Sequence, residues 1–146
     1  MSVKQLHIIN GPNLNLLGKR EPDIYGSTSF DEYLQALRKE FSKISIGYFQ
    51  SNLEGEIIDE LHRLGKDGTP ILLNAGGYTH TSVAIADAVA AVKSPVLEIH
   101  ISQPAAREKE RHNSLLSKYC KGSISGLGLS AYKLGIEYFI THYENH

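Results

Sequence analysis

The sequence predicts a doubly wound α/β domain, in which helices cover both faces of a five-stranded parallel sheet. Short apolar segments alternate with longer amphipathic segments along the whole chain. The apolar segments are almost continuously hydrophobic, as is typical of parallel strands buried on both faces. A chain of 146 residues has the usual size of one domain, so we expect residues 1–146 to fold as a single unit.

The first part of the chain begins with a strand, a helix and a second strand. Residues 3–10 form an apolar strand that glycine and proline stop. Ser29 and Glu32 make a capping box at the start of an amphipathic helix over residues 30–43. Residues 44–50 alternate only weakly, which predicts a strand near the edge of the sheet.

The middle of the chain continues the alternation. A second capping box, Ser51 and Glu54, opens a helix that Gly65 ends. The wholly apolar segment 70–74 predicts a buried strand. A helix rich in alanine and valine then runs over about residues 80–92, and its small side chains suggest close packing.

The last third adds two strands, over residues 96–99 and 122–124, and one helix. The predicted apolar face of this helix comprises Leu127, Ala131, Leu134, Tyr138 and Phe139. Five strands with this alternation indicate a flavodoxin-like sheet, for which the default strand order is 2-1-3-4-5.

The composition is that of an ordinary globular protein, with 41% hydrophobic and 21% charged residues. A net charge of −1 offers no electrostatic surface for nucleic acid or an anionic membrane. No segment has the apolar length of a signal peptide or a membrane span. The single cysteine, Cys120, fits a reducing compartment, so we expect a cytoplasmic protein. Cys120 has no histidine near it in sequence, which disfavours a catalytic role.

Polar residues follow three of the predicted strands where each strand ends. These residues are Asn13, Asn74 and His100, and the glycine pair 76–77 follows Asn74. In the assumed order the three strands are neighbours, so their polar ends should line one crevice. Each residue alone has a structural explanation, because asparagine is common in turns and a histidine at a strand end is often structural. Their coincidence favours a binding site.

The kind of site follows from motifs that the sequence lacks. It contains neither a P-loop nor a dinucleotide fingerprint, and no acidic cluster follows the first strand. His80 and Asp87 lie seven residues apart without a third ligand at zinc-binding spacing, so we expect neither a metal nor a cofactor. The remaining amide, imidazole, guanidinium and phenol groups suit a small oxygen-rich anion and the movement of its protons.

The polar segment after the first strand carries Arg20 and Tyr25. The tyrosine could be an activated base or an aromatic side chain that covers the core. An ordinary tyrosine has a pKa of about 10, so a phenolate base needs a nearby cation. A guanidinium about 4 Å away supplies on the order of 4 kcal/mol at an effective dielectric constant near 20, which suffices if water is excluded.

Three ordered motifs that span most of the chain resemble those of the type II 3-dehydroquinate dehydratases. The motifs are NGPNLNLLG (10–18), LNAGGYTHTSVA (73–84) and EIHIS (98–102), followed respectively by Arg20 and Tyr25, by Asp87, and by Arg107 and Arg111. The resemblance implies a catalytic domain that dehydrates 3-dehydroquinate to 3-dehydroshikimate in the shikimate pathway of aromatic amino acid biosynthesis. It also implies an anti elimination through an enolate, without metal, cofactor or Schiff base.

The resemblance further implies a role for individual residues. Tyr25 would remove the proton next to the ketone, and Arg20 would keep Tyr25 ionised. His100 would protonate the departing hydroxyl, and Asn13 would help to hold a water that stabilises the enolate. The groups implied to bind the substrate are Asn74, His80, Asp87, the backbone at Ile101 and Ser102, and Arg111. The family forms trimers that pack into a dodecamer, with Asp87 of a neighbouring subunit reaching the site.

Three positions depart from the commonest pattern of that family. Gln103 stands where asparagine is usual, and Asn113 where histidine is frequent. We expect these two departures to alter the loop around the substrate carboxylate. Ala86 replaces a frequent arginine and bears on subunit packing.

An alternative interpretation is a non-catalytic flavodoxin-like module that binds a flavin or a phosphate. It predicts a ligand that copurifies with the protein and no reaction with 3-dehydroquinate. The missing phosphate loop after the first strand weighs against it.

Overall fold

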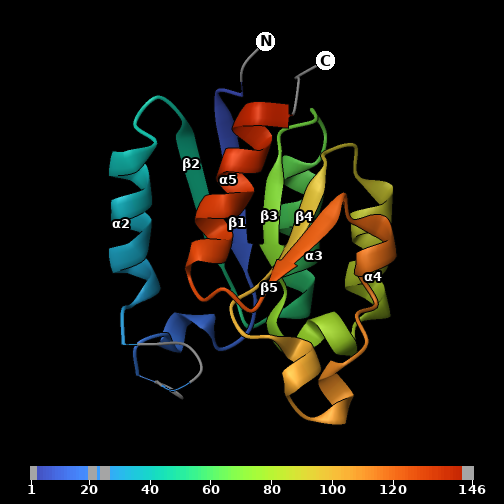
Figure 1. The fold of residues 1–146 in the computed structure, drawn as a ribbon. Coiled ribbons are helices and arrows are strands. Elements are labelled where there is room, and N and C mark those ends of the chain that lie inside the picture. Colours follow the sequence, from blue (N-terminus) through green and yellow to red (C-terminus); the bar gives the residue numbers. More distant parts are fainter. Residues whose placement is uncertain (1–2, 20–22, 24–26, 143–146) are drawn as a thin grey trace.

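The computed structural model describes residues 3–19, 23 and 27–142, which form one five-stranded parallel sheet flanked by helices (Figure 1). The strand order is β2-β1-β3-β4-β5, which confirms the predicted order. The strands are β1 (Gln5–Asn10), β2 (Ser45–Gln50), β3 (Ile71–Asn74), β4 (Val96–His100) and β5 (Gly122–Ser125). The longer helices are α2 (Phe30–Glu40), α3 (Glu54–Leu64), α4 (Val83–Ala91) and α5 (Ser130–His142).

Two helices cover each face of the sheet. Helices α2 and α5 lie on one face, and α3 and α4 lie on the other (Figure 1). Consecutive residues of β1 point to opposite faces, so Ile8 belongs to the core under α2 and α5, whereas Ile9 belongs to the core under α3 and α4. Both side chains are completely buried. No helix in the described part of the chain is long and apolar enough to cross a membrane.

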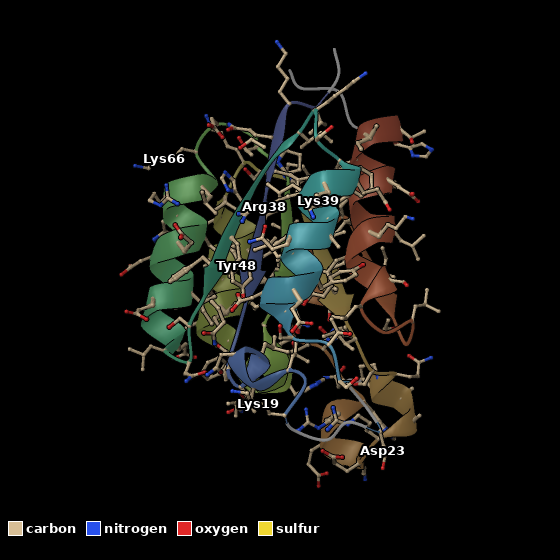
Figure 2. The ribbon with its side chains drawn as sticks, turned by 90° about the vertical axis from the view of Figure 1, so that its left-hand side faces the viewer. Lys19, Asp23, Arg38, Lys39, Tyr48 and Lys66 are labelled. Carbon is tan, nitrogen blue, oxygen red and sulfur yellow. The ribbon has the colours of Figure 1, made fainter. Side chains whose placement is uncertain are left out.

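Helix α2 is joined to the edge strand β2 by hydrogen bonds from one arginine side chain. The Ser29 hydroxyl accepts the backbone N–H of Glu32 (3.2 Å), as expected of the N-cap residue in a capping box. Near the other end, the guanidinium of Arg38 donates two hydrogen bonds to the carbonyl of Ile46 (3.1 and 2.7 Å). Figure 2 shows Arg38 on α2 beside this strand. The helix ends at Glu40 and not at residue 43.

The second predicted capping box does not form. Helix α3 begins at Glu54 with Leu53 as its N-cap, and the Ser51 hydroxyl accepts the N–H of Leu53 (2.9 Å) instead of capping the helix. The Glu54 carboxylate accepts a hydrogen bond from the hydroxyl of Ser82 (2.5 Å). Ser82 is itself the N-cap of α4, where its side chain accepts the N–H of Ile85 (2.9 Å). Glu54 therefore joins the first turns of two helices, which local spacing could not reveal.

The predicted apolar face of α5 was right for Ala131 and Phe139, which are completely buried, but wrong for its two leucines. Leu127 and Leu134 are 56% and 40% exposed, whereas Tyr132 and Ile136 are completely buried. The helix rests on the sheet through Gly135, where a Cβ atom would lie 2.8 Å from Leu72. A glycine allows the helix axis to approach the sheet closely, so Gly135 marks the buried face of α5 and the neighbouring Leu134 does not.

Candidate active site

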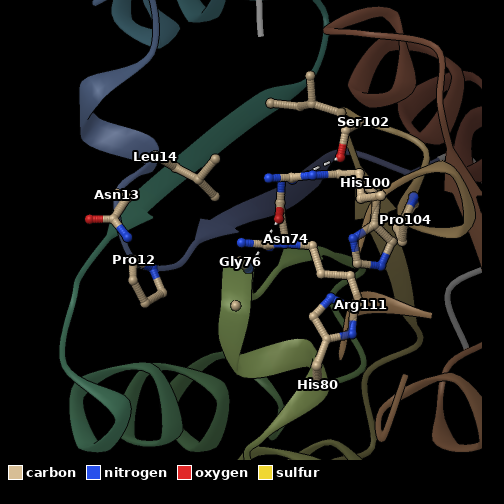
Figure 3. A pocket seen from close by; sticks show the side chains of 13 residues that line it. Pro12, Asn13, Leu14, Asn74, Gly76, His80, His100, Ser102, Pro104 and Arg111 are labelled. Carbon is tan, nitrogen blue, oxygen red and sulfur yellow. Dashed lines mark hydrogen bonds between the residues drawn. The ribbon is translucent and has the colours of Figure 1, made fainter. Parts of the chain in front are cut away.

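A pocket opens beyond the carboxyl ends of β1, β3 and β4, where ligands bind in open parallel sheets (Figure 3). It encloses about 560 Å³, part of which is open to solvent. Its lining includes Pro12, Asn13, Asn74, Gly76, His80, His100, Ile101, Ser102, Arg107 and Arg111. The three polar strand ends that the sequence singled out thus contribute to one pocket, with Asn13 and Arg111 on opposite sides in Figure 3.

Glycine brings the end of β1 against the end of β3. The N–H of Gly11 donates to the carbonyl of Asn74 (2.7 Å), and a Cβ atom at Gly11 would lie 2.5 Å from the carbonyl oxygen of Ala75. Asn13 follows in the left-handed conformation (φ 69°), which asparagine tolerates better than most residues. Its N–H donates to the side chain of Asn52 (3.0 Å). Backbone contacts therefore hold Asn13 at the pocket edge.

His80 lies on the short helix Gly76–His80 that follows β3. Its Nδ1 is 2.9 Å from the backbone carbonyl of Asn113, which can only accept, so a neutral ring carries its proton on Nδ1. Nε2 is then an acceptor available to a ligand hydroxyl. Because Asn113 contributes its backbone, the departure from histidine at this position leaves the contact in place.

A buried carboxylate supports His100. Its Nε2 lies 2.5 Å from Oε2 of Glu98, which is 2% exposed, and Oε1 of Glu98 accepts the hydroxyl of Ser117 (2.6 Å). Burial alone raises the pKa of Glu98, but hydrogen bonds from His100, Ser117 and Ser114 outweigh it and hold this pKa below its usual value. The imidazole therefore meets an ionised carboxylate.

Sequence reasoning missed Glu98 as a site residue. The available signal was a lone charged residue inside an apolar strand, two positions before His100 and so on the same face of β4.

Cationic side chains come from the segment between β4 and β5. Arg107 donates to the hydroxyl of Ser102 (3.2 Å), and Arg111 pairs with Glu108 outside the pocket lining. No Asp or Glu belongs to the pocket lining among the described residues. The two guanidinium groups of Arg107 and Arg111 thus give the pocket lining a positive character, although the chain as a whole carries a net charge of −1.

Two glycines hold the backbone of Ile101 and Ser102. Gly128 and Gly126 donate their N–H groups to the carbonyls of Ile101 (3.0 Å) and Ser102 (2.9 Å). Both glycines have positive φ angles, 63° and 84°. The side chain of Gln103, another departure from the family pattern, accepts the hydroxyl of Ser125 (3.1 Å). The loop before α5 therefore fixes the pocket backbone.

One predicted site residue lies away from the pocket, and two others cannot be placed from the described residues. Asp87 is on α4 and lines a separate surface hollow with Asn113 and Tyr119, so it does not belong to the pocket of its own chain. Arg20 and Tyr25 lie outside the described residues. Within residues 3–19, 23 and 27–142, no three His, Cys, Asp or Glu side chains gather in a group that could hold a metal ion.

Comparisons with known proteins identify the family of this chain. Residues 4–140 match the family described as Dehydroquinase class II. The 3-dehydroquinate dehydratase of Maricaulis maris (strain MCS10) is 49% identical over 142 residues, which cover 96% of this chain and 97% of that protein. The type II dehydroquinase structure from Propionibacterium acnes has a TM-score of 0.91 and 37% identity, with 96% of this chain and 98% of that chain covered. That from Butyrivibrio crossotus DSM 2876 has a TM-score of 0.89 and 39% identity, with 94% and 97% covered. The chain therefore belongs to the class II dehydroquinase family.

Proposed function

We propose that this chain catalyses the dehydration of 3-dehydroquinate to 3-dehydroshikimate, a lyase reaction of the shikimate pathway. Membership of the class II dehydroquinase family supports the reaction. One observation carries the assignment to this pocket: His100, paired with the buried Glu98, lies among cationic and amide groups that suit a carboxylate-bearing substrate.

His100 is the general acid of this proposal. Its Nε2 is engaged by Glu98, so Nδ1 is the nitrogen that delivers a proton to the departing hydroxyl. The ionised Glu98 carboxylate orients the ring and stabilises the imidazolium form, as the aspartate does for the histidine of a catalytic triad.

Tyr25 is the proposed base, with Arg20 as the cation that keeps it ionised. An anti elimination needs the base and the acid on opposite faces of the substrate ring. The segment with Arg20 and Tyr25 follows β1, whereas His100 ends β4, and β3 lies between these two strands. Asn13, at the end of β1, would hold a water beside the developing enolate.

The remaining lining groups would bind the substrate. Asn74, His80 and Arg111 would contact its hydroxyl groups, and the backbone at Ile101 and Ser102 would receive its carboxylate. The proposal needs no metal, cofactor or Schiff base. Borohydride added with 3-dehydroquinate should therefore leave the enzyme active, and inactivation would point to a lysine route instead.

The decisive assay follows the conjugated enone of 3-dehydroshikimate by its ultraviolet absorbance after addition of 3-dehydroquinate. Tyr25→Phe should bind the substrate yet lose turnover by about 10²–10⁴-fold, the usual contribution of a general base. Tyr138→Phe, on α5 and away from the described pocket lining, is the matched control and should keep full activity. Full activity of the Tyr25→Phe variant would refute the mechanism.

Assembly into trimers and a dodecamer would explain the location of Asp87. Because Asp87 lines a different hollow from the pocket of its own chain, it would contribute to catalysis at the site of a neighbouring subunit. Chains with Asp87→Ala and chains with Tyr25→Phe should each be inactive. Dissociated and reassembled together, they should regain activity, since some sites then combine an intact Tyr25 with an intact neighbouring Asp87. No recovery in a mixed assembly would contradict this arrangement.

The cytoplasm is the proposed compartment, because a chain with one cysteine has no need of an oxidising environment. Cell fractionation with an antibody against the protein tests this expectation.

A further inference from the structure

The hydroxyl group of Tyr132 lies between the ends of two strands, although Tyr132 belongs to α5. It donates to Oδ1 of Asn10 (2.7 Å) and accepts from Nδ2 of Asn74 (3.0 Å). Asn10 and Asn74 are register partners in β1 and β3. Tyr132 and Asn10 are completely buried, and Asn74 is 4% exposed. Of the three, only Asn74 belongs to the pocket lining.

One backbone group, the N–H of Gly76, fixes the direction of the hydrogen bonds that link Asn74, Tyr132 and Asn10. The N–H of Gly76 lies 3.1 Å from Oδ1 of Asn74 and can only donate, so the amide oxygen must face Gly76 and Nδ2 must face Tyr132. The tyrosine hydroxyl therefore accepts from Asn74, and its single proton goes to Asn10. Burial, the largest influence, raises the pKa of Tyr132 far above its usual range, so that proton stays in place.

Aromatic packing holds the ring of Tyr132. Its centroid is 4.9 Å from that of Phe30 and 6.5 Å from that of Tyr33, both in edge-to-face geometry. Phe30 also stacks on Tyr48 at 4.9 Å. The hydroxyl thus comes from a ring wedged between α2, α5 and the sheet, and it has little freedom to follow a moving partner.

We infer that Tyr132 is a positioning residue for the dehydration. It holds the Asn74 amide so that the second Nδ2 proton is presented to an oxygen atom of the substrate. The inference rests on the proposed function, because it assigns a task to Tyr132 in that reaction. Without the hydroxyl, the bond to Gly76 alone would orient the amide, and Nδ2 would lose a buried acceptor.

Steady-state kinetics of Tyr132→Phe tests the inference. The KM for 3-dehydroquinate should rise about tenfold, the effect of roughly one hydrogen bond, while kcat falls by less than about threefold. In an Asn74→Ala background the same substitution should change KM by less than about twofold, because Tyr132 acts through Asn74. The inference would be overturned if Tyr132→Phe changed KM equally in both backgrounds, or if it left the KM of the otherwise unmodified protein unchanged.

Tyr33→Phe is the matched control. Tyr33 belongs to the same aromatic cluster, and its hydroxyl bonds to the backbone at Lys133, outside the pocket lining. A purely structural role for Tyr132 predicts that both variants lower the unfolding temperature and leave KM alone. If Tyr132→Phe fails to fold, Asn10→Ala replaces it, and a KM within twofold of the parent would then overturn the inference.

An activity-independent measurement separates the two proposals. The side-chain amide of Asn74 should give a slowly exchanging pair of proton resonances in the parent and in Tyr33→Phe, and a rapidly exchanging pair in Tyr132→Phe. Slow exchange in a parent protein that does not convert 3-dehydroquinate would refute the proposed function alone. Rapid exchange in an active parent would refute the positioning role alone.

Discussion

Oε2 of Glu98 lies 2.5 Å from Nε2 of His100, two residues along the same face of β4. A hydrogen bond to a charged group contributes about 1.5–3 kcal/mol, so Glu98→Gln should lower kcat by about 10–100-fold with little change in KM. Ser117→Ala removes only the 2.6 Å bond to the other carboxylate oxygen and should have a smaller effect. Steady-state rates distinguish these cases, and an unchanged kcat in the Glu98 variant would contradict its role.

Gly126 and Gly128 offer a second test, because their N–H groups hold the backbone of Ser102 and Ile101. Gly128 has open space around it and a φ of 63°, so alanine there adds only backbone strain of about 1–2 kcal/mol. We expect Gly128→Ala to raise KM, and Gly128→Asn to be milder because asparagine tolerates this conformation. Gly55→Ala, at an exposed position in α3, is the control, and it should stabilise the fold by about 0.5–1 kcal/mol without affecting KM.

Acid should destabilise the protein through His7. Burial, followed by the charge of Arg63, lowers the pKa of His7 below its usual 6.5. The unfolded chain then binds the proton more readily, so this contribution to stability is complete above about pH 6.5 and is lost as the pH falls through the pKa of the folded state.

Thermal unfolding at pH 7.5 and 5.5 measures this effect. His7→Gln should show a smaller fall in unfolding temperature between these values than the parent, whereas His62→Gln, at an exposed position on α3, should show the same fall as the parent. Identical pH dependence in all three proteins would exclude His7 as the cause.

Cys120 should be chemically inert in the folded protein. Burial, with a further contribution from Glu98, raises the pKa of its thiol to about 12, and the thiolate is the reactive form. Iodoacetamide at pH 8 should therefore label Cys120 far more slowly in the native protein than in urea, as mass spectrometry can measure. Cys120→Ser should retain activity, and rapid labelling of the native thiol would show that burial does not protect it.

Hydrophobic patterning was sufficient to predict the sheet, because β1, β3 and β4 are largely buried runs and the alternation with helices restricts the strand order. The strand order also predicted which strand ends are neighbours, so Asn74 and His100 could be placed together. The contacts of Glu98, Tyr132 and Gly135 were not predicted. Each residue has its partner far away in sequence or on the same strand face. Asp87 differs in kind, because the site that we propose for it belongs to a neighbouring subunit.

The backbone at Gly18 and at Ser27, on either side of residues 19–26, comes close together. A Cβ atom at Gly18 would lie only 2.7 Å from the carbonyl oxygen of Ser27, so the backbone on either side of residues 19–26 meets at one point. The contact between Gly18 and Ser27 closes the loop from outside residues 19–26. The length of this loop therefore adds little to the entropic cost of folding. Replacing residues 19–26 by two glycines should preserve the unfolding temperature within a few degrees and abolish turnover. We therefore expect that residues 19–26 can be exchanged between relatives without changes to the sheet.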